Sequence, residues 1–194
     1  MKLNADIKFP SPPEWIKAVI SDFDSFLKDH ADCERKASAM AMSFVAKYPD
    51  KIEIIPELID TALEELEHFK LVYEIMCSKG ISLSHQIHED PYIKALLQNV
   101  HSGIKERFLD RLLIASVAET RGAERFRIIA ETLREEDLKR FYKMLWISEA
   151  KHGHSYVKMA LEYFPNEIVY KRLDWWLDIE AEIVRNLKIR PALH

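Results

Sequence analysis

The sequence predicts an all-α fold. Glycine is scarce, with four residues among 194, charged residues make up 31% of the chain, and apolar residues recur at the spacing of a helix face. The clearest such face lies near the N-terminus and consists of Trp15, Ile16, Val19, Ile20, Phe23, Phe26 and Leu27. A chain of this length can bury the core of one domain without disulfides to hold it together. We therefore expect a single helical domain spanning residues 1–194.

Prolines, glycines and capping residues mark the ends of the expected helices. Ser11, two prolines and Glu14 are typical of a helix start, because serine caps, proline suits the first turn and Glu14 completes a capping box. Gly80 can adopt the left-handed conformation that commonly closes a helix. The expected helices cover residues 12–47, 56–79, a short piece that starts at 91 and ends before Gly103, 104–133, a fourth long helix from the turn at 134–137 to about 164, and 167–187.

The loop lengths predict how these helices are connected. Short turns join helix 12–47 to helix 56–79, and helix 104–133 to the fourth long helix, so each pair should form an antiparallel hairpin. A long polar connection, residues 81–90, separates the two hairpins. A single long crossover is typical of ferritin-like bundles. The predicted fold is therefore a ferritin-like four-helix bundle with one long crossover and an additional C-terminal helix.

Charge and cysteine content narrow the functional classes. The net charge of -4 argues against a protein that binds polyanions over its whole surface, although a local basic patch remains compatible with it. The two cysteines are too few for a disulfide framework, and no apolar leader with a cleavage site precedes them. Charged residues interrupt every apolar stretch well before the ~18 residues of a membrane span. We expect a soluble, cytoplasmic protein without a membrane partner.

Two Glu-x-x-His motifs lie on different predicted helices. They are Glu65 to His68 and Glu149 to His152. Residues three apart lie on adjacent turns of one helix face, so a carboxylate and an imidazole can bind one metal ion. The partner helix of each hairpin supplies a further glutamate, since Glu34 precedes Glu65 by 31 residues and Glu119 precedes Glu149 by 30. Corresponding glutamates are 85 and 84 positions apart, which is expected for two similar hairpins that face each other.

The neighbours at three and four residues indicate whether these glutamates face the core, since acidic residues on helices are usually solvated. Small or apolar residues dominate around Glu34, Glu65 and Glu149. Helix 104–133 offers two candidates. The neighbours of Glu119 are small, namely Ala115, Ser116, Gly122 and Ala123, whereas those of Glu124 are mostly polar. We therefore predict that Glu119 is the ligand and keep Glu124 as an alternative that replaces or supports it.

Four buried carboxylates would each cost several kcal/mol unless cations compensated their charge. Two divalent metal ions supply that charge, and four glutamates with two histidines are the ligand set of ferritin-like di-iron and di-manganese proteins. Zinc is disfavoured because its sites use fewer ligands and more sulfur or nitrogen. The predicted ligands of two iron ions, which manganese or zinc could replace in a crystal, are Glu34, Glu65, His68, Glu119, Glu149 and His152. The alternative is that both motifs lie on the surface by chance.

Two neighbours of Glu34 have open roles. His30, one turn earlier, either tunes the metal site or is a hydrogen-bonded core histidine. Cys33 adjoins Glu34 but points about 100° away around the helix, so we expect it to be structural.

Three segments of the chain resemble the tRNA 2-methylthio-isopentenyladenosine hydroxylase family of the MiaE type. They are Asp29 to Ala37, Arg111 through Glu119-Thr120-Arg121 to Phe126, and Ser148 to His152. The first two are more specific than a Glu-x-x-His motif alone, and together the segments span most of the bundle. The family has arginine-serine-cysteine after the third-helix ligand, whereas this chain has Arg121-Gly122-Ala123. That departure changes the packing beside the metals and leaves the ligand set intact.

The resemblance implies an enzyme that hydroxylates the isopentenyl group of a modified adenosine next to the anticodon. Such a reaction uses dioxygen and two electrons from an external donor, so the expected partners are a tRNA that carries a prenylated adenosine and an unidentified reductase. Catalysis would depend on the metal site alone, with no further catalytic residue or cofactor. The expected oligomeric state is a monomer or a small homo-oligomer.

An RNA substrate also requires a phosphate-binding surface, because phosphate contacts supply much of nucleic-acid affinity. Helix 104–133 carries four arginines within about 80° of one another on the helical wheel. They are Arg107, Arg111, Arg121 and Arg125. A solvated or ion-paired helix face is the equally weighted alternative for this stripe.

Two other functional classes compete with this prediction. The first is another ferritin-like di-iron oxidase or ferroxidase that acts on a small molecule or on iron, although the absence of Cys-x-x-Cys pairs disfavours a rubrerythrin. The second is a helical interaction module whose carboxylates bind no metal.

Overall fold

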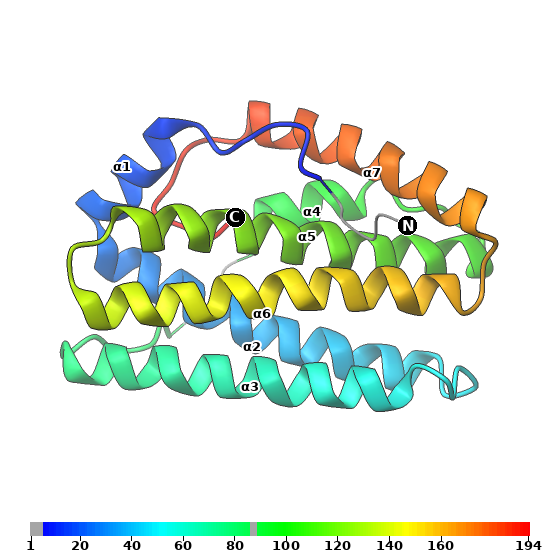
Figure 1. Ribbon diagram of the computed structural model, residues 1–194, viewed down its shortest axis with the longest axis horizontal. Helices are drawn as coiled ribbons and strands as arrows, with labels where there is room; N and C mark the ends of the chain where they lie inside the picture. Colours follow the sequence, from blue (N-terminus) through cyan, green and yellow to red (C-terminus); the bar gives the residue numbers. More distant parts are fainter. Residues whose placement is uncertain (1–5, 86–88) are drawn as a thin grey trace. The chain divides into compact units, whose positions relative to one another are not determined.

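The computed structural model describes residues 6–85 and 89–194. All regular secondary structure in these two stretches is α-helical, which confirms the predicted all-α class (Figure 1). The helices are α1 (Pro13–Ser21), α2 (Phe23–Lys47), α3 (Ile55–Ser78), α4 (Pro91–Leu97), α5 (Ile104–Thr132), α6 (Glu136–Leu161) and α7 (Asn166–Asn186). The middle of the predicted polar connection, residues 86–88, lies outside the described residues.

The chain forms two compact units. The α2–α3 unit comprises Glu14–His88 and Ile189–Leu193, and the α5–α6 unit comprises Met1–Pro13, Glu89–Lys188 and His194. Each unit contains one long helical hairpin, as the loop lengths predicted. The expectation of a single domain stays a prediction.

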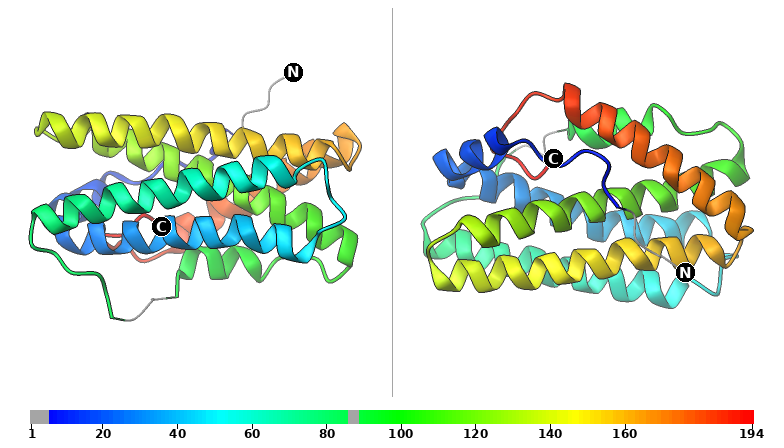
Figure 2. Two further views of the ribbon diagram at one scale, coloured as in Figure 1. Left: turned by 90° about the horizontal axis from the view of Figure 1, so that it is seen from below. Right: turned by 45° about the horizontal axis from the view of Figure 1, so that its top comes forward.

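In the α2–α3 unit, α2 and α3 pack side by side along their lengths (Figure 2). Leu27, Ala31 and Leu58 are among the apolar side chains that the hairpin buries. The hydroxyl of Ser38 on α2 donates a 2.8 Å hydrogen bond to the Ala62 carbonyl on α3 and so links the two helices. Gly80 has a φ of 70°, which confirms its predicted role in ending α3.

The prediction of one continuous helix over residues 12–47 is wrong, because α1 ends at Ser21 and α2 starts at Phe23. Asp22 lies between them with φ -144°, and its side chain accepts a hydrogen bond from the Ser25 amide at 3.1 Å. An aspartate that caps the following helix competes with continuation of the preceding one. Ser11, which we expected to cap the first helix, instead donates its hydroxyl to Glu124 at 2.7 Å.

In the α5–α6 unit, α5 and α6 form the second hairpin, and α7 packs against α4, α5 and α6. The apolar core includes Phe126 and Tyr142, whose rings lie 5.6 Å apart. A buried ion pair joins α5 to α7, since Arg121 Nε donates to Glu180 Oε1 at 2.7 Å. The additional C-terminal helix is therefore held by both apolar packing and charge.

Candidate metal centre

The α2–α3 hairpin places three predicted ligands in one buried cluster. Glu34 on α2 and Glu65 and His68 on α3 each offer a ligand atom, and these atoms lie within 4.8 Å of one another. His68 Nδ1 is 3.3 Å from Glu65 Oε2 and 3.6 Å from Glu34 Oε2. The three side chains are 1–6% exposed, so they face the core as their small and apolar neighbours predicted.

His30 is the closest polar neighbour of this cluster. Its Nε2 lies 2.6 Å from Glu34 Oε1, and the side chain is fully buried. Burial, with the nearby His68 adding to it, lowers the pKa of His30 to about 3, so the imidazole is neutral near pH 7. Both roles that the sequence left open for His30 are therefore compatible with its position, since it is a core histidine that is hydrogen-bonded to a predicted ligand.

Burial also shifts the titration of Glu34. It raises the pKa of this carboxyl to about 8, with Glu65 adding to the increase and the His68 hydrogen bond opposing it. A carboxyl in this environment holds a proton at neutral pH unless a cation replaces it. The cluster therefore has the electrostatics of a site that exchanges protons for a metal ion.

The α5–α6 hairpin contains a matching cluster. Ligand atoms of Glu119 on α5 and of Glu149 and His152 on α6 lie within 4.8 Å of one another, and all three side chains are buried. His152 Nδ1 is 4.0 Å from Glu149 Oε2. The same i, i+3 spacing on one helix thus produces the same pairing of carboxylate and imidazole in both hairpins.

Close helix packing positions the second cluster. The Ser116 hydroxyl on α5 donates to the Gly153 carbonyl on α6 at 2.7 Å. A Cβ at Gly153 would lie 2.9 Å from Thr120 Oγ1 and 3.3 Å from the Ser116 carbonyl oxygen, so the absence of a side chain lets the two helices approach. The glycine directly after His152 therefore allows the short separation of the helices beside the predicted ligands.

The two clusters fit metal ions in the chemistry of their donors. Each offers two carboxylates and one imidazole in a setting nearly free of solvent. Without a cation, two buried carboxylates in each hairpin would repel each other and lack hydration. Oxygen and imidazole donors without thiolates suit iron or manganese better than a structural zinc site.

The structure separates Glu119 from its alternative, Glu124. Glu119 joins the α5–α6 cluster, whereas Glu124 accepts hydrogen bonds from the Ser11 amide and hydroxyl at 2.8 and 2.7 Å. Arg121 Nη1 also donates to Glu124, at 3.0 Å. Glu124 therefore anchors the N-terminal segment to α5.

The predicted arginine stripe needs correction at two of its four positions. Arg121 is fully buried and donates two hydrogen bonds to Glu180, at 2.7 and 2.9 Å. Arg125 is also buried and donates to the Ser11 hydroxyl at 3.1 Å. The N-terminal segment and α7 cover this face of α5, so the ion-paired alternative describes Arg121. Arg107 is exposed and Arg111 is half-buried.

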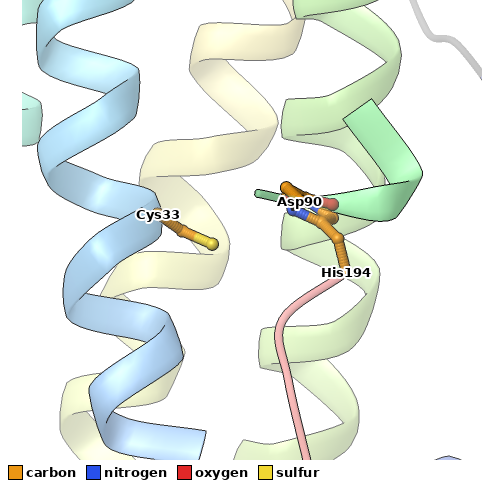
Figure 3. A group of neighbouring side chains, drawn as sticks. All are labelled: Cys33, Asp90 and His194. Atoms are coloured by element: carbon orange, nitrogen blue, oxygen red, sulfur yellow. Dashed lines mark hydrogen bonds and ion pairs between the residues drawn. The ribbon is translucent and has the colours of Figure 1, made fainter. Parts of the chain in front are cut away.

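Two polar groups outside the clusters have structural contacts. His194 lies beside Asp90 in the α5–α6 unit, with Nδ1 3.3 Å from Oδ2, and its ring stacks on Tyr92 at 4.8 Å (Figure 3). Cys33, which Figure 3 also labels, belongs to α2, and its thiol lies 3.8 Å from Asp29 Oδ2. Among the helices described, none is both long and apolar enough to cross a membrane.

Sequence comparisons match the whole chain to one family. A family model described as tRNA-(MS[2]IO[6]A)-hydroxylase (MiaE) matches residues 2–194. A tRNA 2-(methylsulfanyl)-N(6)-isopentenyladenosine(37) hydroxylase of Pseudomonas putida is 30% identical over 185 residues, which cover 95% of this chain and 89% of that protein. A protein of the same name from Salmonella typhimurium is 25% identical, with 90% of this chain and 82% of that protein covered.

A structure comparison agrees with the sequence matches. A solved structure described as protein 43 with aldehyde deformylating oxygenase activity from Synechococcus has a TM-score of 0.89 and 29% sequence identity. The similarity covers 95% of this chain and 92% of that chain. This relative is a ferritin-like helical oxygenase, so the comparison confirms the predicted ferritin-like class.

Proposed function

The chain belongs to the MiaE family of tRNA hydroxylases, and from this premise we propose that it hydroxylates the isopentenyl group of 2-methylthio-isopentenyladenosine next to the anticodon. The structural observation that carries the proposal is the pair of buried clusters, each with two carboxylates and one imidazole. The names of both relatives support the substrate. A tRNA substrate also supports action in the cytoplasm.

The proposed metal ligands are the six predicted residues. Three lie in each unit, and we propose that they hold two iron ions: Glu34, Glu65, His68, Glu119, Glu149 and His152. Bound iron would supply the dioxygen chemistry that no protein side chain provides. In the overall reaction a C–H bond becomes C–OH and the second oxygen atom leaves as water, which consumes two electrons and two protons. The proposal therefore includes an external reductase.

The protein residues contribute orientation and exclusion of water. Neutral His30 can donate its Nε2 proton to Glu34 once that carboxylate is ionised, which fixes the orientation of one ligand. The Ser116 and Gly153 contact holds α5 and α6 at a short separation beside the second cluster. The six proposed ligands are at most 7% exposed, so their surroundings exclude most water from the bound metal ions.

The direct test is nucleoside mass spectrometry of tRNA from cells with and without the gene. The expected result is loss of the hydroxylated adenosine in the deletion strain and accumulation of the unhydroxylated form. A plasmid copy should restore the modification, whereas a copy with Glu65→Ala should not. An unchanged level of hydroxylated adenosine in the deletion strain would refute the proposed substrate.

A second candidate is supported by the structural relative, whose name includes aldehyde deformylating oxygenase activity. On this alternative the same metal site would oxidise a small molecule. It predicts that purified iron-loaded protein consumes oxygen with an aldehyde at a rate that tRNA does not affect. Dependence of oxygen consumption on unhydroxylated tRNA would exclude this candidate.

A further inference from the structure

A second organised polar cluster lies in the α5–α6 unit and centres on Asp110 of α5. This carboxylate is fully buried and accepts hydrogen bonds from Arg172 Nε at 2.6 Å and Nη2 at 3.0 Å. The Trp176 indole donates to it at 3.0 Å, and the His101 amide at 2.9 Å. Asp110 thus links the segment before α5 to helix α7 through hydrogen bonds. Two of them fix one edge of the Arg172 guanidinium.

The outer side of this cluster is an aromatic surface. The Arg172 guanidinium carbon lies 3.7 Å from the centroid of the Trp175 ring, and the Trp175 side of the pair stays exposed, with 36% of the residue accessible. Trp175 also contacts Trp176 edge to face, with ring centroids 4.9 Å apart. These contacts hold the partly exposed indole in a fixed orientation, with the Arg172 guanidinium stacked on one of its faces.

Two exposed cations near this cluster have no carboxylate partner among the described residues. Lys171, one turn earlier on α7, is exposed and forms no ion pair with any residue that the structure describes. Arg107 is exposed and donates only to the carbonyl oxygens of His101 and Ser102, at 3.4 and 3.3 Å. The neighbouring acids of α7, Asp174 and Asp178, share one partner, Lys8, at 2.7 and 2.8 Å, so this trio keeps one net negative charge.

We propose that this surface, which consists of Arg107, Lys171, Arg172 and Trp175, binds the RNA strand of the substrate. One base would stack on the exposed face of Trp175, and phosphates would bind Arg107 and Lys171. A fixed aromatic ring beside free cations is the arrangement that binds unpaired nucleotides without reading their sequence. The choice of RNA over another polyanion rests on the proposed function.

The surface lies at a useful distance from the metal ligands of the same unit. Arg107 precedes Glu119 by twelve residues on α5, which corresponds to about 18 Å along the helix. Stacked nucleotides are spaced by about 3.4 Å per strand, so the distance corresponds to about five nucleotides. The separation along α5 is therefore within the length of a tRNA loop.

The test measures binding of fluorescently labelled, unhydroxylated tRNA to iron-loaded protein by anisotropy over a range of salt concentrations. Trp175→Ala should weaken binding about tenfold with little change in salt dependence, and Trp175→Phe should restore most of the affinity. Arg107→Gln combined with Lys171→Gln should reduce the slope of log affinity against log salt by about 1.5. Lys143→Gln, which removes an exposed lysine of α6, is the matched control and should change neither quantity.

The outcomes distinguish this surface from the proposed function. If wild-type protein binds tRNA and all these variants bind equally well, the surface assignment is wrong and the proposed function stands. If wild-type protein does not bind tRNA at all, both the proposed function and the proposed RNA-binding surface are wrong. Equal iron content in wild type and variants shows that the substitutions leave the fold intact.

Discussion

The two hairpins carry the same types of proposed ligand at nearly the same spacing, but the residues around those ligands differ. Four positions before Glu34 the α2–α3 hairpin has His30, which is hydrogen-bonded to that glutamate at 2.6 Å. Four positions before Glu119 the α5–α6 hairpin has Ala115. Only the first hairpin therefore supplies a second imidazole next to its lone glutamate.

A glycine near the proposed ligands is found in the second hairpin and not at the corresponding position of the first. Four positions after Glu149 lies Gly153, where α5 and α6 touch through the Ser116 hydroxyl. Four positions after Glu65 lies Phe69, whose ring stacks on Tyr73. The two hairpins therefore share the pattern of proposed ligands but hold these side chains in place differently. The α2–α3 hairpin uses a hydrogen bond from His30, and the α5–α6 hairpin uses close packing of its two helices.

The largest expected effect follows from removal of one ligand in either hairpin. Glu65→Ala and Glu149→Ala should each cause loss of at least one of the two proposed iron ions, because no other side chain can take the place of a buried carboxylate ligand. Iron content of the purified protein is the measurement. Glu67→Ala, at an exposed glutamate paired with Lys70, is the control and should keep full iron content. If only one of the two substitutions lowered the iron content, the two hairpins would not contribute equally to metal binding as proposed.

The next effect tests the imidazole that only the first hairpin has. His30→Gln should weaken binding of one metal ion by about 10–100-fold, as is typical of lost outer hydrogen bonds to a ligand. Competition with a chelator measures this affinity. His85→Gln, at an exposed histidine, should have no effect. Unchanged affinity in a folded His30→Gln protein would make His30 an ordinary core residue.

Metal affinity should also depend on pH. Because burial raises the pKa of Glu34 to about 8, metal binding must displace a proton below that pH. Affinity should therefore rise by up to about tenfold per pH unit between pH 6 and 8 and level off above. The pKa of His30, lowered to about 3 by burial, keeps that imidazole neutral over this range, so it adds no pH dependence. A flat affinity profile from pH 6 to 8, measured by metal titration, is incompatible with this account.

The smallest expected effect concerns helix packing in the second hairpin. Gly153→Ala should destabilise the protein by about 1–3 kcal/mol, because the new methyl group meets Thr120, whose hydroxyl is bonded to the Ser116 carbonyl at 2.7 Å. Gly122→Ala is the matched variant, since its Cβ would have only the Glu149 Cγ nearby, at 3.9 Å. Its higher helix propensity should stabilise the protein by up to about 1 kcal/mol. Urea unfolding of both variants measures the difference, and equal stabilities would show that Gly153 is not a packing requirement.

Local signals in the sequence were sufficient for most of the fold. Several helix ends marked by a proline or glycine lie within one or two residues of their predicted positions, as at Gly80 and Pro91. The end expected near residue 164, before Pro165, is less accurate, since α6 ends at Leu161. The buried faces of Glu34, Glu119 and Glu149 followed from the size of neighbouring side chains. Helix ends and buried helix faces depend on residues within one turn of each other, so periodicity and residue spacing are sufficient to predict them.

Features that depend on distant partners were not predictable in this way. The helical wheel places Arg121 on a face with other arginines, but its burial depends on Glu180, 59 residues away. Likewise Ser11 bonds with Glu124 across 113 residues instead of capping the nearest helix. The residues of α7 beside Asp110 were missed because no motif marks them, and only the fold brings Arg172 to that carboxylate.

Anomalous diffraction from iron-loaded crystals, recorded at the iron absorption edge, would locate the metal ions that the two clusters are proposed to bind. We expect two anomalous peaks within coordination distance of the six proposed ligands, which are Glu34, Glu65, His68, Glu119, Glu149 and His152. Absence of iron from these residues, or a single peak bound by one hairpin alone, would refute the proposed di-iron site.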